Sequence, residues 1–156
     1  LSRSRKLKRE NPDLGLIIID YMQLMRADTR NDNRVSEMNE ISRSLKALAK
    51  EIDVPVIALS QLNRAPETRT GKRPVLADLK DSGAIEQDAD IVTFVFRAEK
   101  YEQDIENKGL AIIDVAKHRN GPTGSVKLHF SDKYTKFQDL ALDDPALRNP
   151  DFTEDD

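Results

Sequence analysis

The chain has 156 residues, of which 38% are hydrophobic and 34% charged, a composition typical of one globular domain or a large part of one. It contains no cysteine, which excludes disulfides and thiolate metal sites, and no apolar run near the ~18 residues of a membrane helix. The net charge of −3 is unevenly distributed, with a basic beginning, "RSRKLKRE", and an acidic tail. The average charge is therefore a poor guide to binding partners.

The first half of the chain has the pattern of a strand, a long helix and a second strand. Residues 1–10 look like the end of a basic helix. A strand follows at 15–19, and its three consecutive isoleucines predict burial on both faces, as in a parallel sheet covered by helices. Apolar residues at three- and four-residue intervals over 35–52 predict an amphipathic helix that Asp53 ends. "VPVIAL", 54–59, predicts a second buried strand.

The second half alternates short helical and extended patterns. Residues 63–74 have no apolar periodicity and predict a long mobile loop. Short helical pieces are expected through "VLADLK" and "AIEQDAD". Strands are expected at 91–96, 110–118, 124–130 and 134–140, with a tight turn at "RNGPTG". This order predicts an α/β fold with a mostly parallel sheet and an antiparallel C-terminal hairpin. We expect one domain over 1–140 and a flexible acidic tail over 141–156.

Polar side chains follow both strands of the first half. Asp20 ends "LIIID", and Gln61 follows "VIALS". If the two strands are parallel neighbours, both residues emerge at the sheet edge where α/β proteins bind ligands. A carboxylate there suits Mg²⁺, often through water, and an amide suits a phosphate oxygen or an attacking water. The alternative is that Asp20, Ser60 and Gln61 only cap the following turns, and spacing does not decide between the two.

A pair of cations lies in "KHRNG". Lys117 and Arg119 alternate along the expected strand, so both should point to one side, with His118 opposite. Two cations on one face suit a polyanion, and a guanidinium suits phosphate oxygens. The alternative is two surface cations on an exposed hairpin. His118 and His129 are too far apart for a local metal motif, and we expect both to be ordinary strand residues.

Four stretches together resemble motifs of the bacterial replicative DNA helicases, the DnaB family. They are "LGLIIIDYMQLM", "PVIALSQLNR", "RPVLADLKDSGAIEQDADIV" and "VAKHRNGPTG", in that order and over nearly the whole chain to about Leu140. The resemblance implies a RecA-like P-loop NTPase core that uses ATP and Mg²⁺. It also implies a homohexameric ring around single-stranded DNA in the bacterial cytoplasm, with primase and a helicase loader as partners.

The resemblance also implies roles for single residues. Asp20 matches the Walker B aspartate that supports Mg²⁺, and Gln61 matches the glutamine that links the γ-phosphate to the DNA-binding loops. Lys117 and Arg119 match a basic pair that reaches the nucleotide of the neighbouring subunit, with Arg119 as an arginine finger. His118 stands where glutamine is common in the family, and its side chain should face away from the phosphates.

The stretch "DLKDSGAIEQ" matches the DNA contact of the family. Lys80 offers a charge where arginine is frequent, and Gly83 would let a phosphate approach the backbone at the start of a helix. Contacts of this kind carry no sequence information, which suits a motor on any DNA. Asp81 lies beside them and should accept a hydrogen bond or turn away. The loop cations Arg64, Arg69, Lys72 and Arg73 would add steering, and the alternative for most of them is that they belong to a solvated loop.

Two components of a nucleotide motor are missing from the chain. No G-x-x-x-x-G-K-[ST] cradle occurs, and the general-base glutamate of the family belongs upstream. We therefore expect this chain to be the C-terminal part of a larger motor and to be inactive alone. The alternatives are a RecA-type recombinase or repair ATPase, which "DLKDSGAIEQDAD" disfavours, and a non-catalytic module. The joint presence of Asp20, Gln61, Lys117 and Arg119 disfavours the latter.

Overall fold

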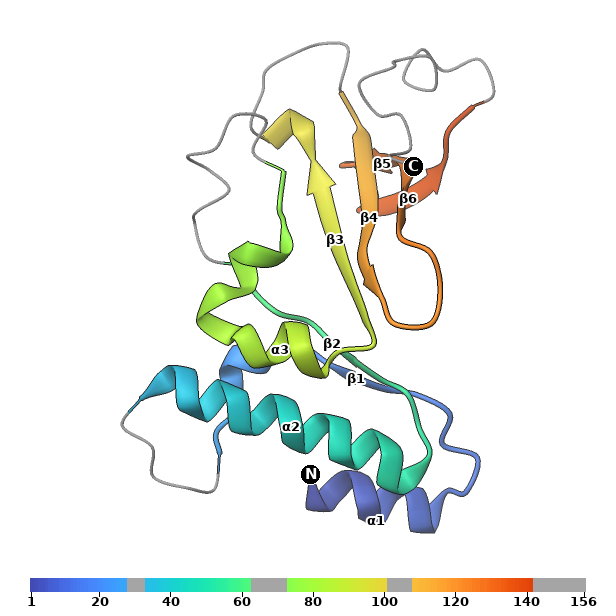
Figure 1. Ribbon diagram of the computed structural model, residues 1–156. Helices are drawn as coiled ribbons and strands as arrows, with labels where there is room; N and C mark the ends of the chain where they lie inside the picture. The colour runs from blue at the N-terminus through green and yellow to red at the C-terminus, as the bar shows by residue number, and fades with distance from the viewer. Residues whose placement is uncertain (28–32, 63–72, 101–107, 142–156) are drawn as a thin grey trace. The chain divides into compact units, whose positions relative to one another are not determined.

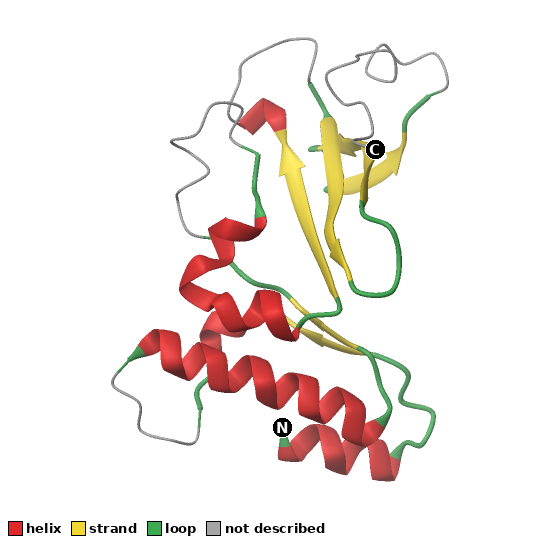
Figure 2. Ribbon diagram, viewed as in Figure 1, coloured by secondary structure: helices red, strands yellow, loops and turns green. Residues whose placement is uncertain are grey.

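The computed structural model describes residues 1–27, 33–62, 73–100 and 108–141, which form two compact units (Figure 1). Unit 1 consists of Leu1–Asn63 and Ala77–Ala89, and unit 2 of Arg64–Leu76 and Asp90–Asp156. The α-helices belong to unit 1, and unit 2 is built mainly from strands (Figure 2). None of the helices in the described part of the chain combines the length and apolar character that a membrane crossing requires.

Unit 1 contains the strand–helix–strand arrangement that the sequence predicts. Its elements are α1 (Ser2–Glu10), β1 (Ile17–Ile19), the 3₁₀ helix η1 (Met22–Leu24), α2 (Arg34–Ile52), β2 (Val56–Ala58) and α3 (Gly83–Asp88). The 3₁₀ helix η3 (Leu76–Ser82) leads into α3. β1 and β2 pair in parallel, with Ile17 opposite Val56 and Ile19 opposite Ala58. The predicted parallel pairing is therefore confirmed.

Helix α2 forms where the apolar periodicity predicts it, and its buried side supplies the core of unit 1. Met38, Ile41 and Leu45 pack with Met22 of η1, and Ile85 of α3 lies against this cluster. The side chain of Asn33 accepts a hydrogen bond from the N–H of Val35 and so caps the helix. Asp53 adopts a left-handed conformation, with φ of 51°, and ends the helix as expected.

The prediction that the first strand is buried on both faces is wrong for this chain, and so is the prediction that the second strand is buried. Ile18 is 62% exposed, and its partner across the sheet, Ile57, is 52% exposed. Both residues lie on the same face of the two-stranded sheet, because partners in register point the same way. Ile19, on the other face, packs against the cluster of α2. Within the described residues, that second face is covered at Ile19, while its register partner Ala58 is exposed.

Unit 2 is a four-stranded antiparallel sheet. Its elements are β3 (Ile91–Arg97), the 3₁₀ helix η4 (Ala98–Lys100), β4 (Leu110–His118), β5 (Gly124–Ser131) and β6 (Lys136–Asp139), and the strand order is β3-β4-β5-β6. Along β3 every second side chain is buried, which gives one covered face. The predicted α/β class and C-terminal hairpin are confirmed. The antiparallel part is larger than a hairpin, and parallel pairing among the described residues is confined to β1 and β2.

An ion-pair network lies at the end of β3. Arg97 contacts Glu99 and Asp132, lies 2.7 Å from the latter, and stacks its guanidinium 3.8 Å from the ring centre of Phe130. Glu99 also accepts a hydrogen bond from the N–H of Gly109 at 2.7 Å. Gly109 has φ of 77°, a conformation that L side chains rarely adopt. The network thus ties the end of β3 to the start of β4 and to the β5–β6 turn.

The expected acidic tail, apart from Ala141, and most of the expected mobile loop lie outside the described residues.

Candidate functional site

Asp20 and Gln61 lie at the same edge of the parallel pair. Asp20 directly follows β1, and Gln61 comes three residues after the end of β2. The two segments stay together beyond the paired residues, because the N–H of Leu59 donates to the carbonyl of Ile19 at 2.9 Å. Both polar side chains are exposed, and the peptide bond after Asp20 is cis. The structure therefore brings the predicted carboxylate and amide to the carboxyl edge of one sheet, while their roles remain predictions.

Sequence reasoning missed Gln23, which links these two strand ends. Its side-chain amide donates to the hydroxyl of Ser60 at 3.0 Å and to the carbonyl of Gln61 at 3.1 Å. Its side-chain oxygen accepts the N–H of Gln61 at 3.2 Å. The position of Gln23, three residues after Asp20 in "DYMQLM", was the only signal in the sequence. A second part of the site is thus a clamp on the backbone of Gln61.

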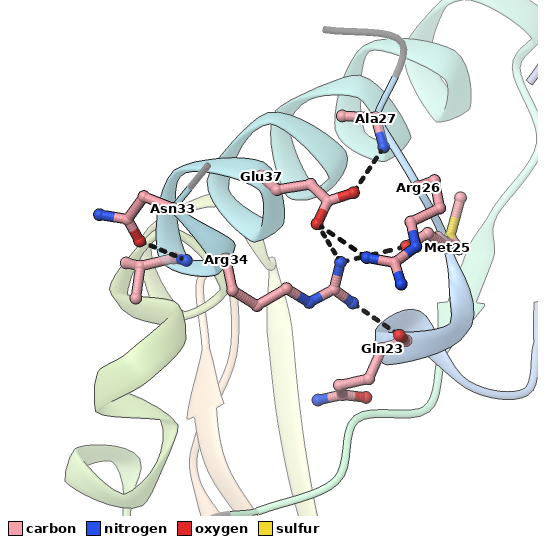
Figure 3. A network of polar contacts seen from close by, with 8 residues as sticks. Gln23, Met25, Arg26, Ala27, Asn33, Arg34 and Glu37 are labelled. Atoms are coloured by element: carbon pink, nitrogen blue, oxygen red, sulfur yellow. Dashed lines mark hydrogen bonds and ion pairs between the residues drawn. The ribbon is translucent and has the colours of Figure 1, made fainter. Parts of the chain in front are cut away.

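A buried carboxylate holds the segment that contains Gln23 (Figure 3). Glu37 of α2 is only 7% exposed, accepts the N–H of Ala27 at 3.1 Å and forms a close ion pair with Arg34. Arg34 in turn donates to the carbonyl of Gln23 at 2.6 Å. Arg26 approaches the same carboxylate at 3.5 Å. Hydrogen bonds from Arg34 and from the N–H of Ala27 hold the pKa of Glu37 below its ordinary value.

We expect Glu37→Gln to lower the melting temperature of the chain at pH 7 by several degrees, because the variant loses the ionic partner of Arg34. The pKa of Glu37 is lowered by folding, so its contribution to stability is present above the unfolded value of 4.5 and is lost as pH falls through the folded pKa. The difference between wild type and variant should therefore shrink in thermal melts taken below that pH. Asp13→Asn, which neutralises an exposed carboxylate, is the control. A constant difference at all pH values would contradict the assignment.

Lys117 and Arg119 lie at the end of β4 in unit 2. Lys117 pairs in register with Val92, next to a bulge at which Ala116 has no opposite residue in the register. Strand β4 ends at His118, so the predicted strand alternation does not extend to Arg119. Instead the backbone N–H of Arg119 donates to the carbonyl of Asp90 at 2.8 Å, and its side chain pairs with the carboxylate of Asp90 at 3.1 Å. Asp90 is a second residue that the sequence reasoning missed.

The Arg119 side chain remains half exposed in this ion pair, so a further anion can reach the guanidinium.

The side chain of His118 contacts the β4–β5 turn instead of an anion site. Its Nδ1 lies 3.1 Å from the carbonyl of Pro122, and its ring covers Gly121, where an added Cβ would come within 2.3 Å of it. His118 thus packs on the β4–β5 turn, and both histidines are strand residues, as expected.

Three of the four predicted DNA-contact residues lie at or just before the start of α3 along the chain. Lys80 and Asp81 belong to η3, and α3 begins at Gly83, as the sequence predicts. The side chains of residues 80–83 lie outside what the structure describes. Arg73 is half-buried. The other loop cations of the prediction, Arg64, Arg69 and Lys72, lie outside the described residues.

The residues present are compatible with Mg²⁺ held chiefly by water and phosphate. Within the described ranges, no cluster of three or more His, Cys, Asp or Glu side chains is arranged to hold a metal ion. Mg²⁺ is commonly bound through one or two carboxylates plus substrate phosphates, and an exposed carboxylate at a strand end meets that requirement. Asp20 is the residue in this position. A dedicated protein cage for another metal finds no support in this part of the chain.

Comparison with known proteins matches nearly the whole chain to one protein family. Residues 1–139 match the model of the family described as DnaB-like helicase C terminal domain. The replicative DNA helicase DnaB of Pasteurella multocida (strain Pm70) is 57% identical over 140 residues, which cover 90% of this chain and 30% of the relative. That of Geobacillus stearothermophilus is 54% identical over 140 residues, 89% of this chain and 31% of the relative. The chain thus spans about 30% of the length of these curated relatives.

Two solved structures support the same family. One solved structure, described as an ATPase domain, has a TM-score of 0.85 at 46% identity, and the match covers 90% of this chain and 50% of that one. A second, described as "The Structure Of A DnaB-Like Replicative Helicase And Its Interactions With Primase", has the same TM-score and identity and covers 90% and 34%. The resemblance seen in the four sequence motifs is confirmed.

Proposed function

This chain belongs to the DnaB-like helicase C-terminal domain family, and on that premise we propose that it is part of an ATP-driven motor that moves on single-stranded DNA and unwinds duplex at the replication fork. The family match over residues 1–139 carries the proposal. The common edge of β1 and β2, which brings Asp20 and Gln61 together, supports it. Residues 1–140 would be the motor part, and residues 141–156 an acidic tail.

In the proposed site, the carboxylate of Asp20 supports Mg²⁺ on the nucleotide, with water and phosphate as the other ligands. Bound Mg²⁺ neutralises phosphate charge and orients the nucleotide. The exposed amide of Gln61 contacts the γ-phosphate and transmits its presence to the DNA-binding loops. Lys117 and Arg119 place two cations on the nucleotide bound by the adjacent subunit, where Arg119 exchanges the carboxylate of Asp90 for phosphate oxygens. This division of roles requires a neighbouring subunit, and we propose a homohexameric ring, as the family implies.

The DNA contact in this proposal is the start of α3. Lys80 supplies charge, Gly83 gives a phosphate access to the backbone, and Asp81 lies between them in the sequence. Arg73, which belongs to the other unit, is proposed as a further cation for the DNA. One similar structure is described with primase, which supports primase as a partner of the assembled protein. On the same family premise, we propose a helicase loader as a second partner and the bacterial cytoplasm as the location of the protein.

The proposal is tested by comparing ATP hydrolysis of this chain with that of the full-length protein. The chain contains no phosphate cradle of the form G-x-x-x-x-G-K-[ST], so the purified 156-residue chain should not hydrolyse ATP and should bind it only weakly. The full-length protein, meaning this chain joined to a P-loop segment, should hydrolyse ATP faster when single-stranded DNA is present. Hydrolysis by the 156-residue chain alone would refute our account of the divided site. A full-length protein that binds DNA and never hydrolyses ATP would favour the non-catalytic module.

A further inference from the structure

The side chain of Gln23 occupies the position of a strand neighbour beside Gln61. Strand β2 ends at Ala58, so Gln61 lies beyond the regular pairing with β1. There the amide of Gln23 donates to the Gln61 carbonyl at 3.1 Å and accepts the Gln61 N–H at 3.2 Å. Both backbone hydrogen-bonding groups of Gln61 are thus engaged by one side chain. A third bond, to the Ser60 hydroxyl at 3.0 Å, fixes the same amide.

Gln23 is itself held from two sides. The N–H of Met22 donates to the carbonyl of Leu59 at 2.9 Å, which keeps η1 beside the end of β2. On the other side, Arg34 donates to the Gln23 carbonyl at 2.6 Å, and Glu37 orients Arg34 (Figure 3). Gln23 therefore connects α2, which is bonded to its backbone carbonyl, to the backbone of Gln61, which is bonded to its side chain.

We propose that Gln23 is a positioning residue that fixes the backbone of Gln61, so that the side-chain amide of Gln61 is held where it can contact a phosphate. The inference rests on the proposed function, because it needs Gln61 to be the phosphate sensor. A misplacement of about 1 Å can cost a catalytic site about a hundredfold, so a sensor on an exposed segment needs such support. Gln23 acts through Gln61 and touches no nucleotide in this proposal.

The chemistry of the side chain explains why an amide stands here. An amide has one acceptor and two donors, which match the N–H of Gln61 and the two oxygens of Gln61 and Ser60. A carboxylate of the same shape keeps the acceptor and loses both donors. A methionine of similar length keeps neither. Gln23→Glu and Gln23→Met therefore disrupt the clamp in two chemically different ways at nearly constant volume.

The experiment measures ATP hydrolysis of the full-length protein with and without single-stranded DNA, together with hydrogen exchange of the Gln61 amide. We expect Gln23→Met to reduce the stimulation by DNA about tenfold, the ratio that one or two net hydrogen bonds correspond to. Exchange at Gln61 should speed up. Gln23→Glu should also lose stimulation, because its second carboxylate oxygen faces the Gln61 carbonyl without a proton to donate. Gln138→Met, the same change at an exposed residue of β6, is the control and should behave as wild type.

Gln61→Ala separates the inference from the function on which it rests. If Gln61→Ala uncouples hydrolysis from DNA but Gln23→Met does not, the sensor stands and the positioning role is overturned. If Gln61→Ala keeps full stimulation, the sensor role fails and the positioning role fails with it. A Gln23→Met protein that melts earlier and loses both rates in equal proportion would mean that the residue serves only the fold, which also overturns the proposal.

Discussion

Arg119→Ala should lower ATP hydrolysis by the assembled ring about a thousandfold while leaving nucleotide binding largely intact. An arginine supplied by a neighbouring subunit stabilises charge on the transferred phosphoryl group, an effect on the order of 10³ or more in comparable systems. The guanidinium is half exposed beside Asp90, so it is available to a partner's nucleotide without disturbing a core. Hydrolysis rates and nucleotide affinity, measured on the same ring preparation, check the expectation. Arg43→Ala, an exposed arginine on α2, is the matched control.

A mixing experiment tests whether the arginine acts between subunits. Rings are formed from Arg119→Ala protein and from a full-length partner whose P-loop lysine is disabled. Each variant lacks a different half of a shared site, so some interfaces of a mixed ring have both halves intact. Hydrolysis should return in part, even without DNA. If rings shown to be mixed recover nothing, Arg119 serves its own subunit, and its ion pair with Asp90 becomes its main role.

Asp20→Ala should reduce Mg²⁺-dependent hydrolysis by the full-length protein about a hundredfold or more. Metal support of phosphate charge contributes several kcal/mol to such transition states, and each tenfold in rate corresponds to about 1.4 kcal/mol. Because Asp20 is exposed at a strand end, the change should leave the melting temperature nearly unaltered. Asp20→Asn keeps the shape and removes the charge, so it should also raise the Mg²⁺ concentration needed for half-maximal activity.

The control for Asp20 is Asp13→Ala, which removes an exposed carboxylate that precedes β1 and has no place in the proposed site. It should retain the rate and the Mg²⁺ requirement of the wild type. An Asp20→Asn protein with unchanged rate and unchanged Mg²⁺ dependence would remove the metal-supporting role, and the residue would then be read as a cap of the turn into η1.

The sequence alone determined the elements whose signal lies within one segment. The recurrence of apolar residues predicted α2 and its end at Asp53, because residues three and four apart share a helix face. The turn residues after His118 predicted the hairpin of β4 and β5 in the same way, whereas the antiparallel pairing of β3 with β4 was not predicted. Asp20 and Gln61 were also predictable candidates, since a polar residue after an apolar strand must emerge where water or a ligand can solvate it.

Only the tertiary structure decided which of these segments meet. The hydrogen bonds of Gln23 join residues 37 and 38 positions apart and exist only once β1 and β2 pair in parallel. The ion pair of Arg119 with Asp90 likewise depends on the register of β3 against β4. A long polar side chain has several rotamers, and nothing in local periodicity selects the one that reaches a distant partner. The exposure of Ile18 and Ile57 is also decided by the tertiary structure. The apolar sequence of a strand predicts that its faces will be buried, but it does not identify the elements that would bury them.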